Sequence, residues 1–249
     1  MPSQKPTFLL AHGAWHKPEA YRFLLRALES RGYPTAAPEL PSGMDQTPAD
    51  PPGADARCLR DAARDLIGDG KELVVIAHSY GGAVVAEAFN GMGVRERQAK
   101  GLTGGVRMIV RIAAFVLEQG KSFEDYVPVD SVPWTHYKGD MKVITPGFDI
   151  GKICYDDVPK EVQQKFSSSL TNHPKACSLY SPKEPRYNEI DQAYVYCEQD
   201  VAFPLIAQQF MVGNIKNQGV SFKEASLSSS HFPMLSMPEE LADKIVEFL

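Results

Sequence analysis

From Leu73 to Gly82 the chain reads Leu-Val-Val-Ile-Ala-His-Ser-Tyr-Gly-Gly, and this stretch decides the fold. The apolar run at 73–77 has the length of a strand that is buried on both faces of a sheet. The small residues from Gly81 to Phe89 are typical of a helix that packs closely on a sheet. Ser79 is therefore predicted to lie on a sharp strand-to-helix turn, which would lift its hydroxyl above the edge of the sheet.

Such a turn needs small residues on both sides of the serine, because strand and helix approach each other closely there. Gly81 occupies the second small position, whereas Ala77 stands at the first, where the G-x-S-x-G pattern has glycine. The alternative interpretation is a serine that only caps a helix. For His78 we favour a packed, hydrogen-bonded histidine over a base, because adjacent residues at a tight turn point in different directions.

Strands and helical patterns alternate along most of the chain, which predicts an α/β fold with a mostly parallel sheet flanked by helices. Strands are expected at 7–11, 35–37, 106–115, 193–197 and 220–225, and helices at 19–30, 54–67, 203–211 and 238–249. Residues 118–189 break the alternation, and their best helix is 159–170. We interpret 118–189 as a cap inserted into a single domain with a core of 1–117 and 190–249, because no flexible linker flanks it.

The composition excludes several classes of function. The chain of 249 residues is 43% hydrophobic and 23% charged, an ordinary globular balance. A formal net charge of −5 argues against nucleic acid or an anionic membrane as a partner. No apolar run reaches the roughly 20 residues that span a bilayer, no secretory signal is visible, and the four scattered cysteines lack metal-ligand spacing. We expect a cytoplasmic protein with reduced thiols and no bound metal. The composition does not decide between a monomer and a homodimer.

A serine hydroxyl becomes a good nucleophile only when a base takes its proton and an acid orients that base. Among the six histidines, His231 follows the last expected strand and precedes the closing helix. It fits the chain order of serine, acid and histidine. Asp200 stands just past the strand at 193–197 and is our preferred acid, with Glu118 and Glu198 as weaker alternatives.

The stretch His12-Gly13-Ala14 follows the first strand. Gly13 allows the backbone there to turn an amide toward the serine without a Cβ clash. We expect a backbone N–H group of this loop and that of Tyr80 to form the two halves of an oxyanion hole.

Position along the chain also suggests which side chains line a substrate site. Trp15 and His16 follow the loop at 12–14 and Phe115 follows a strand end, whereas a roof from the inserted segment could be formed by Trp134, Tyr137, Cys154 and Tyr155. Ordinary packing is an equal alternative for these roof residues. His136 and His173 also lie in the inserted segment, where we favour surface positions although either could contact a substrate. An aromatic or polyketide-like substrate would suit such a lining.

Together these segments resemble the α/β-hydrolase superfamily, in the branch of plant methyl-ester esterases and hydroxynitrile lyases with their microbial relatives. The matching stretches are 11–16, 77–82, 113–115, 196–200, Pro204 and 230–232, spread over nearly the whole chain. The resemblance implies a triad of Ser79, His231 and Asp200, with oxyanion-hole amides from Ala14 and Tyr80 and no cofactor.

Two positions depart from the family pattern, Ala77 in place of glycine and Phe232 after the base. Neither carries a catalytic atom. Dehalogenases and epoxide hydrolases of this fold carry an aspartate at the turn, so Ser79 excludes both.

We therefore predict a serine hydrolase that cleaves an ester or lactone of a small, fairly apolar molecule through an acyl-enzyme. Two alternatives stay open. A lyase, such as a carbon–carbon bond-cleaving enzyme, would use the same triad, and no lysine of the inserted segment clearly marks such a site. A small-molecule binding protein would carry a vestigial triad, which the intact Ser79, Asp200 and His231 argue against.

Overall fold

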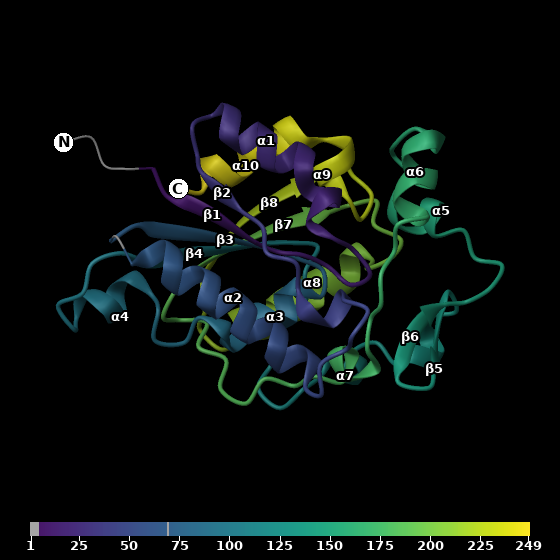
Figure 1. Ribbon diagram of the computed structural model, residues 1–249, viewed down its shortest axis with the longest axis horizontal. Helices are drawn as coiled ribbons and strands as arrows, with labels where there is room; N and C mark the ends of the chain where they lie inside the picture. The colour runs from purple at the N-terminus through teal and green to yellow at the C-terminus, as the bar shows by residue number, and fades with distance from the viewer. Residues whose placement is uncertain (1–4, 69) are drawn as a thin grey trace.

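The computed structural model describes residues 5–68 and 70–249. A six-stranded sheet with the order β2-β1-β3-β4-β7-β8 forms the centre, and every neighbouring pair is parallel (Figure 1). Its strands are β1 (Thr7–Ala11), β2 (Thr35–Ala36), β3 (Glu72–His78), β4 (Gly105–Ile112), β7 (Asp191–Cys197) and β8 (Phe222–Leu227). The predicted fold class is thereby confirmed. Because the strands are parallel, the loops that leave their carboxyl ends gather at one edge.

Helices cover both faces of the sheet (Figure 1). One face carries α1 (Arg22–Ser30), α9 (Pro233–Ser236) and α10 (Pro238–Glu247), and the other α2 (Pro51–Ile67), α3 (Gly81–Ala88) and α8 (Leu205–Lys216). The helix α4 (Val94–Gln98) precedes β4, and short 3-10 helices lie at Pro18–Tyr21, Pro41–Gly43, Phe123–Asp125 and Val129–Ser131. Alternate residues of each strand enter opposite cores: Val75 faces α2 and α3, whereas Val74 faces α1 and α10.

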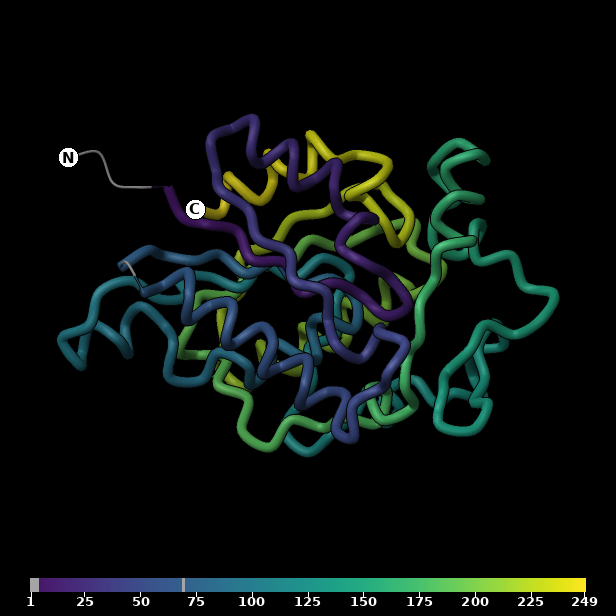
Figure 2. Tube along the Cα trace, viewed as in Figure 1, coloured from purple at the N-terminus to yellow at the C-terminus, as the bar shows by residue number. Residues whose placement is uncertain are grey.

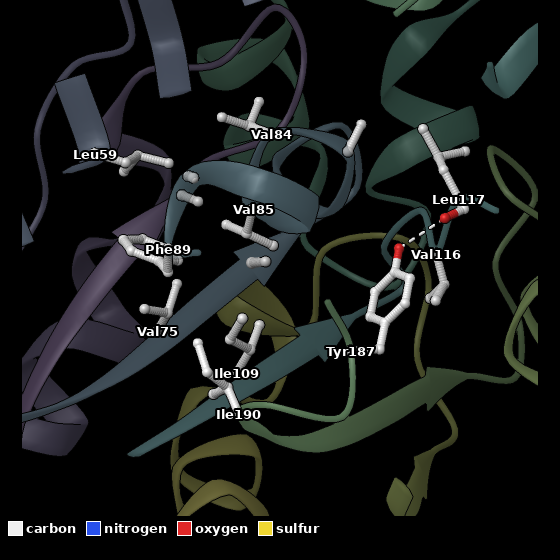
Figure 3. Close-up of a cluster of buried hydrophobic side chains, with 14 of the residues drawn as sticks. Leu59, Val75, Val84, Val85, Phe89, Ile109, Val116, Leu117, Tyr187 and Ile190 are labelled. Carbon is white, nitrogen blue, oxygen red and sulfur yellow. Dashed lines mark hydrogen bonds between the residues drawn. The ribbon is translucent and has the colours of Figure 1, made fainter. Parts of the chain in front are cut away.

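Figure 3 shows part of the core between the sheet and the helices α2 and α3. Leu59 of α2 and Val85 of α3 pack toward Val75 of β3, and all three side chains are buried. Burying a side chain of this size stabilises the fold by about 1.5–3 kcal/mol. On the far side of the cluster, the hydroxyl of Tyr187 donates a 2.8 Å hydrogen bond to the carbonyl of Leu117. This bond ties the two ends of the inserted segment to each other.

Residues 118–189 leave the sheet after β4 and return at β7. They form an antiparallel hairpin of β5 (Thr135–Lys138) and β6 (Met141–Ile144), followed by α5 (Ile150–Cys154), α6 (Lys160–Ser167) and α7 (Lys175–Ser178). The hairpin, α5 and α6 lie together on the side of the molecule opposite the C-terminus (Figures 1 and 2). The sequence predicted the helix α6 but not the hairpin, whose mixed polar residues conceal the alternation of a strand.

The strand expected at 106–115 ends early, at Ile112. Ala113 has a φ of 41°, which turns the chain out of the sheet. The amide of Phe115 then donates a 3.1 Å hydrogen bond to the carbonyl of Ser79. The apolar run continues past the strand because its last residues support the neighbouring turn.

Gly81 lies where α3 passes closest to β1, and a Cβ there would lie 2.2 Å from the carbonyl oxygen of Ala11. We expect Gly81→Ala to lower the free energy of unfolding by about 2–3 kcal/mol, because neither backbone can move away without unpacking α3. Gly213→Ala in α8 is the matched control, since nothing lies within 4 Å of its new methyl group. This control should raise stability by about 0.5–1 kcal/mol. Urea titrations measure both, and equal stability of Gly81→Ala and the wild type would contradict the close packing.

Candidate active site

Ser79 lies on the turn between β3 and α3 with a φ of 52°, in the left-handed region that serine rarely adopts. Its carbonyl accepts hydrogen bonds from the amides of Gly82, at 3.0 Å, and Phe115, at 3.1 Å. A Cβ at Gly82 would lie 2.3 Å from the carbonyl oxygen of Phe115, so the turn needs a glycine there. The methyl group of Ala77 is fully buried within the same turn. The sequence therefore forms the expected strand–turn–helix geometry with alanine in the first small position.

His231 lies in the loop after β8, and its ring is held by Asp200. The Nδ1–H of His231 donates to Oδ2 of Asp200 at 2.6 Å, and both side chains are buried. Asp200 in turn accepts a 2.8 Å bond from the amide of Phe203 and a 3.4 Å bond from the buried side chain of Gln208. This pairing fixes the tautomer in which Nε2 of His231 can accept a proton.

Ser79 and His231 line the same cavity, with Asp200 behind the imidazole. Within residues 5–68 and 70–249, the Ser79 hydroxyl makes no hydrogen bond to the protein. The alternative acids lie elsewhere: Glu118 accepts a 2.8 Å bond from Tyr126, and Glu198 is exposed. The structure thus brings together the three predicted residues and separates them from the two alternatives.

Two backbone amides remain open beside Ser79. In the described part of the chain, neither the Ala14 nor the Tyr80 N–H donates a hydrogen bond to another protein atom. Ala14 lines the cavity, and Tyr80 precedes the first turn of α3, where the helix dipole favours negative charge. The Gly13 N–H is engaged, because it donates a 2.7 Å bond to the hydroxyl of Tyr21. These two free amides are therefore the candidate donors to a negatively charged substrate oxygen.

Tyr21 and His78 connect the loops around the site. The Tyr21 hydroxyl donates to Nδ1 of His78 at 2.7 Å, and the Nε2–H of His78 donates to the carbonyl of His231 at 2.9 Å. Burial lowers the pKa of His78 well below its usual value, so its ring is neutral. The interpretation of His78 as a packed, hydrogen-bonded histidine is confirmed.

The cavity wall combines residues of the core with residues of the inserted segment. The core contributes Gly13, Ala14, Trp15, His16, His78, Ser79, Phe115, Ala202, Phe203, His231 and Phe232, and the segment contributes Phe123, Val132, Trp134, Thr135, Lys142, Cys154, His173 and Ser178. Trp15, His16, Phe115 and Trp134 therefore lie where position along the chain placed them. Most of these side chains are apolar or aromatic, which suits a largely apolar ligand.

Tyr137 and Tyr155 do not belong to this wall, which corrects the expected roof. Tyr155 is fully buried in the core, and its hydroxyl is hydrogen-bonded to Nε2 of His16. The ring of Tyr137 instead packs under Lys175, whose ammonium lies 4.6 Å from the ring centroid. Both tyrosines support neighbouring residues of the fold rather than facing the cavity.

His173 and Lys142 are wall residues that the sequence did not favour: His173 was the weaker candidate for a substrate contact, and Lys142 was not singled out. His173 is buried, so the expected surface position is wrong. Its ring centroid lies 5.0 Å from that of Trp15 and 4.9 Å from that of Tyr80, and burial lowers its pKa to about 3. His136 is half-buried against Thr145 and lies outside the wall. No local pattern distinguishes these residues, because their burial depends on contacts with distant parts of the chain.

Two negative findings apply to residues 5–68 and 70–249. No group of three or more His, Cys, Asp or Glu side chains there could hold a metal ion. No helix within those ranges has the length and apolarity needed to cross a membrane.

Residues 8–244 match the alpha/beta hydrolase family. The chain belongs to this family. A probable hydrolase from Phoma sp. is 26% identical over 248 residues, covering 98% of this chain and 98% of that protein. Methylesterase 7 from Arabidopsis thaliana is 25% identical, and the match covers 96% of this chain and 95% of that protein. The crystal structure of polyneuridine aldehyde esterase superimposes with a TM-score of 0.77 at 18% identity, covering 98% of this chain and 99% of that one. The family match confirms the predicted α/β-hydrolase resemblance, and a plant methylesterase is among the proteins to which the chain is similar.

Tyr21→Phe tests the connection between the loops. Removing the hydroxyl leaves the Gly13 amide and Nδ1 of His78 without partners, so we expect a loss of about 1–3 kcal/mol in the free energy of unfolding. Tyr33→Phe is the control, since the Tyr33 hydroxyl makes no hydrogen bond within the described residues and should change stability by less than about 0.5 kcal/mol. Chemical denaturation measures both variants. Equal effects of the two substitutions would show that the Tyr21 hydroxyl does not hold the loops.

Proposed function

We propose that the chain is a serine hydrolase that cleaves an ester or lactone of a small, fairly apolar molecule. The observation that carries this proposal is His231, bonded to buried Asp200 at 2.6 Å, in the same cavity as Ser79 on its left-handed turn. Esterase and hydrolase names recur among the relatives, including a methylesterase from Arabidopsis thaliana and a pyrethroid hydrolase from Sphingobium wenxiniae. The apolar cavity wall supports an apolar substrate.

In the proposed reaction, Oγ of Ser79 attacks the substrate carbonyl carbon while Nε2 of His231 takes the hydroxyl proton. Asp200 stabilises the imidazolium that results. The Ala14 and Tyr80 amides donate to the carbonyl oxygen as it becomes negative. Collapse of this intermediate breaks the bond to the alcohol oxygen, which receives the proton from His231 and leaves an acyl-enzyme. Water then attacks the acyl group by the same route, releasing the acid and restoring Ser79.

We further propose that residues 118–189 act as a cap over this site. Phe123, Trp134 and His173 of this segment face the same cavity as Ser79. A cap of this kind excludes water and shapes the space for the acyl and alcohol groups. The core would then supply the chemistry, whereas the segment would select the substrate.

A fluorophosphonate probe combined with substitutions tests the mechanism. Wild-type protein should be labelled at Ser79, and Ser79→Ala should lose labelling and at least about 10⁴-fold in kcat toward p-nitrophenyl acetate. Asp200→Asn should lose about 10⁴-fold, because the base then adopts the wrong tautomer. Ser228→Ala, at an exposed serine of the loop before His231, is the control and should label like the wild type.

Folded wild-type protein that stays unlabelled would refute the hydrolase proposal and favour a binding protein. Labelling without turnover on a broad panel of esters and lactones would instead favour a lyase that uses the same residues.

A further inference from the structure

Lys142 is a buried lysine in the cavity wall. It lies on β6, and only 5% of its surface is exposed. Its backbone is fixed on both sides: the amide donates to the carbonyl of His173 at 2.8 Å, and the carbonyl accepts from Nε1 of Trp15 at 3.0 Å. The fold therefore fixes the backbone from which this side chain reaches the cavity wall.

The ammonium of Lys142 has no counter-ion in direct contact. Among the described residues, no carboxylate oxygen lies within 4.0 Å of its Nζ and no acceptor forms a hydrogen bond with it. Burial lowers the pKa of Lys142, and Glu124 opposes this by attracting the ammonium without forming an ion pair; Nζ lies 5.3 Å from the ring centroid of Phe123. An ammonium buried without a hydrogen-bonded partner is costly. A group that enters the cavity and supplies acceptor oxygens would offset this cost.

The surroundings of Lys142 suit an anion. The hydroxyl of Thr135 is buried, lacks any hydrogen-bond partner, and belongs to a residue of the same wall. Ser178 and the neutral ring of His173 also line it. No aspartate or glutamate belongs to the cavity wall as described, and Glu124, whose charge acts on Lys142, lies outside that wall.

We propose that Lys142 binds an anionic oxygen group of the substrate, either a carboxylate or an ionised phenol or enol, while the ester lies at Ser79. This inference rests on the proposed function, because it names the substrate class of that site. The ammonium supplies the charge, and the Thr135 hydroxyl offers a further hydrogen bond. The remaining wall is largely apolar, so the anionic group of the substrate would bind beside Lys142 and thereby orient the rest of the substrate.

Binding to a catalytically inactive background tests this directly. Two matched probe pairs are used: monomethyl glutarate against dimethyl glutarate, and methyl 4-hydroxy-3-nitrobenzoate, with its phenol ionised, against its 4-methoxy analogue. Isothermal titration of Ser79→Ala should show at least about tenfold tighter binding of the anionic member of one pair. If the anionic probe binds more tightly than its neutral analogue in only one pair, that pair identifies the preferred anion as a carboxylate or as a phenolate.

The same titrations are repeated with a second substitution. Lys142→Met, and Lys142→Gln as a second neutral variant in case methionine disturbs folding, should abolish the preference, whereas Lys142→Arg should restore part of it. The matched control is Lys138→Met, at an exposed lysine of the same hairpin, which should keep the preference. Circular dichroism confirms that each variant is folded.

Equal binding of charged and neutral probes, a preference that survives Lys142→Met, or no binding of any probe would overturn the inference. None of these outcomes would contradict the proposed function, because that function is tested separately by fluorophosphonate labelling of Ser79. Conversely, an unlabelled Ser79 together with a Lys142-dependent preference would refute the hydrolase and retain the anion site.

Discussion

A series of buried hydrogen bonds fixes the positions of the loops of this site relative to one another. It runs from the amide of Gly13 after β1, through Tyr21, to His78 at the end of β3 and on to the carbonyl of His231 after β8. Each donor in it meets one acceptor, so movement of any loop would leave a buried polar group unpaired at a cost of about 1–3 kcal/mol. The relative positions of the loops that carry Gly13, Ser79 and His231 therefore depend on His78, whose two ring nitrogens both form hydrogen bonds within the fold.

The neutrality of the buried imidazoles is a second condition for the proposed chemistry. Burial lowers the pKa of His12 to about 4 and that of His16 to about 3. The Nδ1–H of His16 donates to the carbonyl of Ala14 at 2.6 Å, which leaves its Nε2 to accept from Tyr155. Cationic rings here would oppose the imidazolium that forms on His231 during acyl transfer. In the proposed mechanism, these neutral rings would leave Asp200 to stabilise the imidazolium of His231 without competition from neighbouring cations.

The sequence predicted those features that local chemistry imposes. A buried strand followed by small residues specifies the turn at Ser79, and chain order relative to strand ends located Asp200 and His231. Prediction from the sequence failed where the orientation of a side chain on a helix decides whether it faces the cavity. Cys154 and Tyr155 are adjacent at the end of α5, yet only Cys154 faces the cavity. One step along a helix turns a side chain by about 100°, and without knowing which face packs on the core the sequence cannot separate the two.

The sequence did not predict the burial of Lys142, and a backbone contact of this residue also links two parts of the site. A lysine in a polar segment is ordinarily solvated, whereas this one is buried, and its carbonyl accepts a hydrogen bond from Trp15, which lies 127 residues earlier. Trp15 directly follows Ala14 and itself has a φ of 60°. The hairpin that presents the ammonium and the loop that presents the Ala14 amide are thus joined through one indole. Displacing β6 would break that bond and release the loop, so the two ends of the cavity cannot be positioned independently.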